Sequence, residues 1–256
     1  MQEVLAIALG SMQNDLARLD QVSMNLANVA TPGYKRGMVV QQHNAAAFSA
    51  ALDAAAVAAN GVGVGSSLGV PSLTLGMDPR AGTFKATGQS LDVAIGNSGY
   101  FEVATDKGPA YTRQGSFRVD AQGRLVTAQG HAVMGVGGEI FLTSSSASIS
   151  ATGVVSERGT GDSERVIGQL KLMQFPDDAR PERLGDGLLA AAQGMTPVAA
   201  GETQLRQGFV ENSNVNAAHE MTQLIQTMRH FESMHRIAQS HDEMLGTAIR
   251  KLGETS

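Results

Sequence analysis

The end of the chain carries an apolar residue at nearly every third or fourth position, and this pattern restricts the fold more than any other feature. Only His235 and Asp242 interrupt it, and Asn216 before it is a suitable N-cap. Such spacing is typical of positions a and d of a coiled-coil helix. The residues at these positions are Ala217, Met221, Leu224, Met228, Phe231, His235, Ala238, Asp242, Leu245, Ile249 and Leu252.

The beginning of the chain has a matching pattern over residues 4–28. Its apolar stripe consists of Leu5, Ala8, Met12, Leu16, Leu19, Val22 and Leu26. Thr31 precedes Pro32 and is disfavoured in the α region, while Gly33 can adopt a positive φ, so we expect this helix to end near Ala30. Neither helix can bury its stripe alone. We therefore expect the two terminal helices to pair as a coiled coil, and to pack against neighbouring molecules.

Between the helices the pattern changes to short segments typical of strands, separated by clusters of Gly, Asn, Asp and Ser such as residues 97–99 and 120–123. No helix long enough for a parallel crossover lies among them, which predicts an antiparallel β domain. The candidate strands are residues 91–95, 100–104, 110–113, 116–119, 124–127, 132–136, 148–155, 166–175 and 188–191.

These patterns predict an α+β chain with four parts. Residues 1–33 form the N-terminal helix of the coiled-coil layer, residues 34–76 a connector, and residues 77–207 the central all-β domain. Residues 208–256 form a return segment and the C-terminal helix of the coiled-coil layer. The composition of residues 41–76, Ala-rich and then Gly-rich, favours an extended or flexible connector, although a surface loop with a short Ala helix explains it equally well.

Composition excludes several classes of function. A net charge of −5 lacks the basic surface that a protein binding nucleic acid or an anionic membrane shows. The absence of cysteine excludes disulfides, thiolate zinc sites and cysteine nucleophiles. No apolar run approaches the roughly 20 residues of a membrane span. Glu3 and the lack of an Ala-x-Ala site argue against a cleavable signal peptide.

Catalytic and metal motifs are weak. Residues 65–69, Gly-Ser-Ser-Leu-Gly, match the nucleophile elbow of serine hydrolases around Ser67, but Val70-Pro71 follows where a helix is needed. The histidines of the C-terminal helix are separated by eleven, five and six residues instead of the four that a helical metal pair requires. We expect no enzyme activity, no cofactor and no metal, with a secreted serine hydrolase as the alternative.

Four separated motifs occur in order along the chain: residues 25–35 (Asn-Leu-Ala-Asn-Val-Ala-Thr-Pro-Gly-Tyr-Lys), 91–101, 111–127, and 208–216 continuing to Glu220-Met221 and 242–245. Together they resemble the axial proteins of the bacterial flagellum, namely the rod subunits of the basal body and their hook relatives. Residues 130–135 and 167–172 resemble the proximal-rod F-type protein, whereas residues 242–245 resemble the distal-rod G-type protein. The subtype stays open.

The resemblance implies a structural subunit that assembles helically in the periplasm into the drive shaft that transmits torque to the hook. It implies export by the flagellar type III apparatus without signal cleavage. The implied partners are other copies, other rod and hook proteins, and the ring bushing around the shaft, with no nucleic acid and no membrane insertion. A hook subunit and a coiled-coil adhesin are the alternatives. A single β region leaves little room for the outer domain that hook subunits usually carry.

The expected assembly seam consists of side chains on the two helix stripes. Asn25 and Asn28 lie on or beside the first stripe, where an unsatisfied amide would be costly. We expect them to hydrogen-bond across subunits or to the backbone at the helix end, with solvent exposure as the alternative. The seam residues are Leu16, Leu19, Leu26, Asn25, Asn28, Met221, Leu224, Met228, Phe231, Leu245 and Ile249.

Overall fold

The computed structural model describes residues 2–41, 73–144, 147–158, 164–176, 179–199 and 201–254. The chain divides into two compact units. The helix unit comprises Met1–Leu26, Gly37–Gly76 and Ala217–Ser256. The β unit comprises Ala27–Arg36 and Met77–Asn216, so the chain passes four times from one unit to the other.

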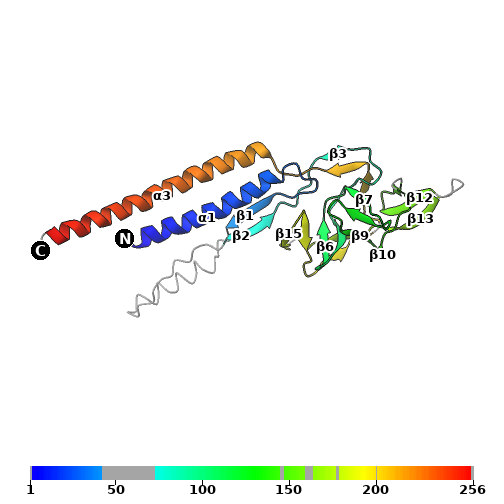
Figure 1. The fold of residues 1–256 in the computed structure, drawn as a ribbon, viewed down its shortest axis with the longest axis horizontal. Coiled ribbons are helices and arrows are strands. Elements are labelled where there is room, and N and C mark those ends of the chain that lie inside the picture. The colour runs from blue at the N-terminus through cyan, green and yellow to red at the C-terminus, as the bar shows by residue number, and fades with distance from the viewer. Residues whose placement is uncertain are drawn as a thin grey trace. The chain divides into compact units, whose positions relative to one another are not determined.

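In the helix unit, α1 (Gln2–Ala27) and α3 (Ala217–Glu254) lie side by side and run in opposite directions (Figure 1). Two contacts fix this arrangement, because Asn25 bonds to Glu220 and Asp15 bonds to His230. The strands β1 (Gly37–Gln41) and β2 (Leu73–Met77) form a two-stranded sheet. The predicted α+β class is confirmed, and the coiled-coil geometry of the helix pair stays a prediction.

The helix boundaries follow the sequence signals. The first helix ends at Ala27 and is followed by turns through Gly33, whose φ is 69°, as expected for a glycine that ends this segment. The second begins at Ala217, directly after Asn216. Neither described helix is long and apolar enough to cross a membrane.

The β unit consists of short strands. In chain order they are β3 (Phe84–Ala86), β4 (Val93–Ile95), β5 (Tyr100–Thr105), β6 (Gly108–Thr112), β7 (Phe117–Val119), β8 (Leu125–Thr127), β9 (Ala132–Gly135), β10 (Gly138–Glu139), β11 (Ser148–Ile149), β12 (Val154–Arg158), β13 (Glu164–Gln169), β14 (Leu172–Gln174), β15 (Arg183–Gly185), β16 (Leu188–Ala190), β17 (Thr196–Pro197), β18 (Leu205–Gln207) and β19 (Phe209–Glu211).

These strands pair in the antiparallel sense that the sequence predicts. The largest sheet has the order β15-β16-β6-β5-β9-β8-β7, with β10 on β9, β14 on β5 and β17 on β14. A second sheet has the order β11-β12-β13. Two strands near the end of the unit return to its beginning, since β18 pairs with β4 and β19 pairs with β3. Closure of the unit therefore requires both ends of its sequence.

The larger of two buried apolar clusters holds most of the β unit together. Phe101, Val93 and Val103 are fully buried in it, and the rings of Phe101 and Phe117 meet edge to face at 5.0 Å. Leu205 of β18 belongs to the same core, although more than a hundred residues separate it from β4 and β5. Each fully buried side chain of this size contributes roughly 1.5 to 3 kcal/mol.

The structure differs from the predicted strands in several places. Six strands of the β unit were not among the candidates: β3, β10, β15, β17, β18 and β19. The predicted strand 148–155 is interrupted at Gly153, whose φ is 86°, and becomes β11 and β12. The predicted strand 166–175 breaks before Leu172 into β13 and β14. The ends of the predicted connector 34–76 form β1 and β2, while residues 42–72, including Ser67, lie outside the described residues. The four-part division itself stays a prediction.

Candidate functional site

The two helices face each other with one row of buried and half-buried side chains each, which we call the inner rows. In both, the residues are spaced by three and four positions, as in a heptad. The inner row of α1 is Leu5, Ala8, Met12, Asp15, Leu19, Val22 and Leu26. The inner row of α3 is Glu220, Leu224, Thr227, Phe231, Met234, Ala238 and His241.

The expected seam coincides with these rows only in part. Leu19, Leu26, Leu224 and Phe231 belong to the inner rows. Three seam residues are instead largely exposed, namely Leu16 by 50%, Met221 by 56% and Met228 by 48%. The residue directly before each of them takes the inner position: Asp15, Glu220 and Thr227. The side chains of Leu245 and Ile249 lie outside the described residues.

Polar residues sit inside the helix pair at other positions than the sequence indicates. His235 and Asp242, the expected interruptions, are exposed. Asp15 is 2% exposed, and its Oδ2 lies 2.6 Å from Nδ1 of half-exposed His230 on the opposite helix. His241 is buried, and neither ring nitrogen has a hydrogen-bond partner among the described residues. Buried polar contacts of this kind set the register of a helix pair.

Asn25 is 1% exposed and uses both polar atoms of its side chain twice. Its Nδ2 donates to the carbonyl of Gly37 at 2.9 Å and to Oε2 of Glu220 at 3.0 Å. Its Oδ1 accepts from the Gly37 N–H at 2.9 Å and from Nε2 of Gln21 at 3.2 Å. A side-chain amide has two donors and two acceptor positions, so these intrachain bonds use all of them. Asn25 thereby joins α1, β1 and α3.

Asn28 behaves differently from Asn25. It is half-buried at the end of the first helix, and its Oδ1 accepts a hydrogen bond from the Thr31 hydroxyl at 3.1 Å. This contact closes the turn that leads to Pro32 and Gly33. The expectation that Asn28 contacts another subunit stays a prediction.

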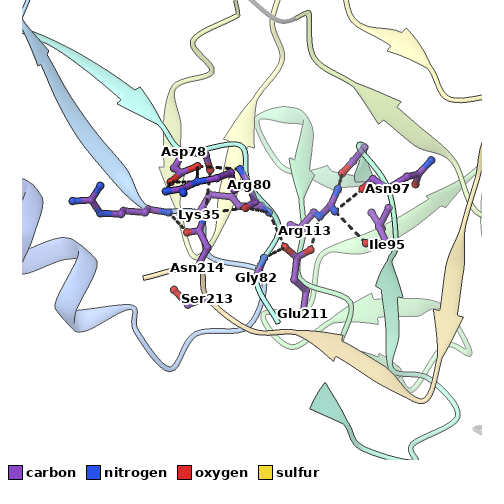
Figure 2. A network of polar contacts seen from close by, with 12 residues as sticks. Lys35, Asp78, Arg80, Gly82, Ile95, Asn97, Arg113, Glu211, Ser213 and Asn214 are labelled. Carbon is purple, nitrogen blue, oxygen red and sulfur yellow. Dashed lines mark hydrogen bonds and ion pairs between the residues drawn. The ribbon is translucent and has the colours of Figure 1, made fainter. Parts of the chain in front are cut away.

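The β unit contains a buried cluster of charges centred on Glu211 (Figure 2). One carboxylate oxygen of Glu211 accepts from Nζ of Lys35 at 2.6 Å and from the Gly82 N–H at 2.9 Å. The other accepts from Nε of Arg113 at 2.6 Å. The main-chain carbonyl of Glu211 accepts from the Gly33 N–H at 2.7 Å. All three charged side chains are at most 5% exposed.

Arg113 and Lys35 extend the cluster into the surrounding loops. The Arg113 guanidinium donates to the carbonyls of Ile95 and Asn97 (Figure 2). It also donates to the carbonyl of Gly99. Lys35 also donates to the carbonyl of Arg80 at 2.8 Å. Both cations therefore have several acceptors each, which compensates for their removal from water.

The segment around Lys35 is held from a second direction by β15. Arg183 donates to the carbonyl of Lys35 at 2.5 Å, and its guanidinium lies 4.7 Å from the centre of the Tyr34 ring. Asn214 completes the arrangement, because it accepts from the Arg36 N–H at 2.6 Å and donates to the Asp78 and Arg80 carbonyls. Residues 33–36, 78–82 and 211–214 are thereby tied to each other within the β unit.

Electrostatics in the cluster favours the ionised carboxylate. Burial alone would raise the pKa of Glu211, but the charges and hydrogen bonds of Arg113 and Lys35 outweigh it and hold that pKa below its ordinary value. Burial lowers the pKa of Lys35, and Glu211 offsets only part of this effect. The pKa of Asp78 is lowered by the hydrogen bonds and charge of Arg80.

The sequence motifs contain these residues without revealing their role. Lys35 lies in the motif of residues 25–35, Arg113 in that of 111–127 and Glu211 in that of 208–216. Lys35 and Glu211 are the only charged residues of their motifs, whereas the motif of Arg113 also contains Arg118, Asp120 and Arg124. Among the described residues, no group of three or more His, Asp or Glu residues could hold a metal ion. In this arrangement the cluster holds chain segments together.

Comparison with known proteins gives a consistent picture. Residues 206–251 match the family model "Flagellar basal body rod FlgEFG protein C-terminal", and residues 94–157 match "Flagellar hook protein FlgE/F/G D1 domain". Over 96% of its length the chain is 31% identical to the flagellar basal-body rod protein FlgG of Bacillus subtilis, covering 97% of that protein. It is 35% identical to FlgG of Buchnera aphidicola from Acyrthosiphon pisum, with 88% and 90% covered. It is 32% identical to FlgF of Escherichia coli, with 98% and 99% covered.

Proposed function

The chain belongs to the flagellar basal-body rod proteins of F or G type and is a structural subunit of that rod, and we propose that it builds the rod by packing its terminal helices against those of neighbouring copies. A repeated contact between unlike surfaces builds an open helical array when its rotation does not close into a ring, and the proposed contact is of this open kind.

The observation that carries this proposal is the apolar surface left on the helix pair. Five large apolar side chains on α3 are exposed by 43% to 58%: Met221, Ile225, Met228, Ile237 and Met244. Ile7, Leu9 and Leu16 on α1 are exposed by 50% or more. A solvated helix face normally carries polar residues, so apolar side chains on both helices favour further helices as neighbours.

A location and a mechanical role complete the proposal. We propose that the subunit occupies the periplasmic rod, reaches it through the flagellar type III apparatus without signal cleavage, and transmits torque to the hook. Other rod and hook proteins would adjoin it along the shaft and the ring bushing would surround it. A non-catalytic role agrees with the charge cluster, whose groups are engaged in holding chain segments. The hydrolase, hook and adhesin alternatives gain no support from the relatives.

The test is incorporation into purified basal bodies. A strain in which an epitope-tagged copy replaces the native gene should swim, and the tag should co-purify with the rod after the outer filament is removed. A deletion strain should be non-motile with incomplete rods. Complete rods in the deletion strain would contradict the proposal.

A further inference from the structure

The helix pair presents two exposed faces of different composition, and we propose that one face of each copy docks on the other face of the next. This inference rests on the proposed function and assigns the surfaces and polarity of that contact. The partner is a second copy of this chain.

The faces follow from helix geometry. Residues directly after an inner-row residue are displaced by about 100° around the helix, and residues directly before it by the same angle in the opposite direction. Because the helices are antiparallel and both right-handed, residues that follow the inner row lie on one side of the pair in both helices. Residues that precede it lie on the other side. We call these sides face A and face B.

Face A is apolar over the first half of α3 and the facing part of α1. Its large apolar residues are Leu9, Leu16, Met221, Ile225 and Met228, each 48% to 56% exposed. Leu9 and Leu16 are seven residues apart, as are Met221 and Met228, so each pair repeats at the heptad spacing that helix packing needs. This regular spacing indicates that face A can pack against another helix.

Face B is partly occupied within the chain. Asn25 and Gln21 precede inner-row residues, and Asn25 bonds to Gly37 of β1. Ile7 and Ile237 also precede inner-row residues but are exposed by 64% and 43%. The register set by Asp15 and His230 brings Ile7 and Ile237 to the same level of the pair. Among the described residues, the part of face B that stays exposed is therefore an apolar site toward the N-terminus of α1.

The charges on the two faces have opposite sign. Face A carries the carboxylates of Asp20, Glu232 and Asp242 and the imidazole of His235. Face B carries the guanidinium of Arg18 and the imidazoles of His219 and His230. Two copies joined by face A alone would bring like carboxylates together, whereas face B supplies a cation. Docking of A on B pairs opposite charges, which selects the head-to-tail contact over a symmetric dimer.

The cysteine-free sequence allows a direct test by cross-linking. A Met228→Cys chain carrying one epitope and an Ile237→Cys chain carrying another are co-expressed, and isolated basal bodies are treated with a short bismaleimide. We expect dimers that contain both epitopes, in several-fold excess over dimers of either variant with itself. Predominant Met228→Cys dimers with themselves would overturn the proposal, as would incorporated chains that do not cross-link.

A matched control and an independent variant complete the test. Arg229→Cys is exposed on the side of α3 away from the inner row, next to Met228, and should give no such excess with Ile237→Cys. Glu232→Arg reverses a charge on face A and should lower incorporation at least ten-fold, whereas Arg229→Glu, on the outer side of α3, should not. Equal incorporation of both charge variants overturns the docking of A on B. Absence of the unmodified chain from basal bodies would instead contradict the proposed function.

Discussion

The side chain of Asn25 pairs with the backbone of Gly37 as a neighbouring strand would, donating to its carbonyl and accepting from its N–H, both at 2.9 Å. The same amide donates to Glu220, so one residue joins the end of α1, the start of β1 and the first turn of α3. These bonds depend on the amide, because a carboxylate has no donor.

Asn25→Asp should therefore destabilise the helix unit by about 3 kcal/mol or more, since it places an unpaired carboxylate against Glu220 and the Gly37 carbonyl. Thermal unfolding followed by the helical circular dichroism signal measures this loss. Adding Glu220→Gln supplies a donor opposite the new carboxylate and should recover part of the stability. If the effects of the two substitutions on the free energy of unfolding simply add, the loss does not arise from the contact between these two side chains.

Gly33 shows how backbone geometry restricts a single position. Its φ is 69°, and a Cβ there would lie 2.5 Å from the backbone carbon of Arg113. Gly33→Ala should cost at least about 2 kcal/mol, because the left-handed conformation is strained and the neighbouring backbone cannot move aside. Gly88→Ala is the matched control, with φ of 70° and no atom within 4 Å of the new Cβ. Equal losses for the two variants would mean that crowding against Arg113 contributes nothing.

Much of the architecture could be predicted because its signals are local. Helix periodicity, the Thr-Pro-Gly end of the first helix and the turn clusters of the β region each lie within a short window. Apolar periodicity does not separate the inner rows from the exposed apolar residues Leu16, Met221 and Met228, each of which directly follows an inner-row residue. Hydrophobicity marks those positions as buried, but it does not tell whether a partner helix belongs to the same chain or to another molecule.

The charge cluster could not be predicted for a different reason. Lys35 lies 176 residues from Glu211, and Arg113 lies 98 residues from it, so no local pattern connects them. Charged residues are normally exposed, and a sequence gives no reason to bury these three together. Their contact depends on the pairing of β19 with β3, which brings the end of the β unit back to its beginning.

Glu211→Gln should destabilise the β unit by about 3 to 5 kcal/mol at neutral pH, because it leaves Lys35 and Arg113 buried without a counter-charge. Tyrosine fluorescence during urea unfolding reports this unit, since Tyr34, Tyr100 and Tyr111 are the three tyrosines of the chain and all are buried in it. Glu139→Gln, whose partly exposed carboxylate lies 3.9 Å from Arg124, should change stability by less than about 0.5 kcal/mol.

The same substitution should alter the pH dependence of stability. The pKa of Glu211 in the folded chain lies below its ordinary value, so its contribution is complete above the unfolded pKa of about 4.3 and is lost as pH falls through the folded pKa. The difference in unfolding free energy between the unmodified chain and Glu211→Gln should therefore shrink as the solution is acidified below about pH 4. If this difference in unfolding free energy stays constant until the protein unfolds in acid, it does not arise from the charge of Glu211.

Phe231 and Met228 separate pairing within the chain from assembly between chains. Phe231 is half-buried in the inner row, next to His230 at the level of Asp15, whereas Met228 is 48% exposed on face A. Phe231→Asp removes apolar contact worth roughly 2 kcal/mol for a half-buried ring and places a second carboxylate near Asp15. We expect a weakened helix signal, no incorporation into the rod and no motility.

Met228→Asp should keep the wild-type helix signal in the isolated chain and still fail to incorporate, since its side chain is needed only by the neighbouring copy. Both variants should keep the tyrosine transition of the β unit. A loss of that transition in Phe231→Asp would place Phe231 in the β unit, and normal swimming of Met228→Asp would remove Met228 from the assembly surface.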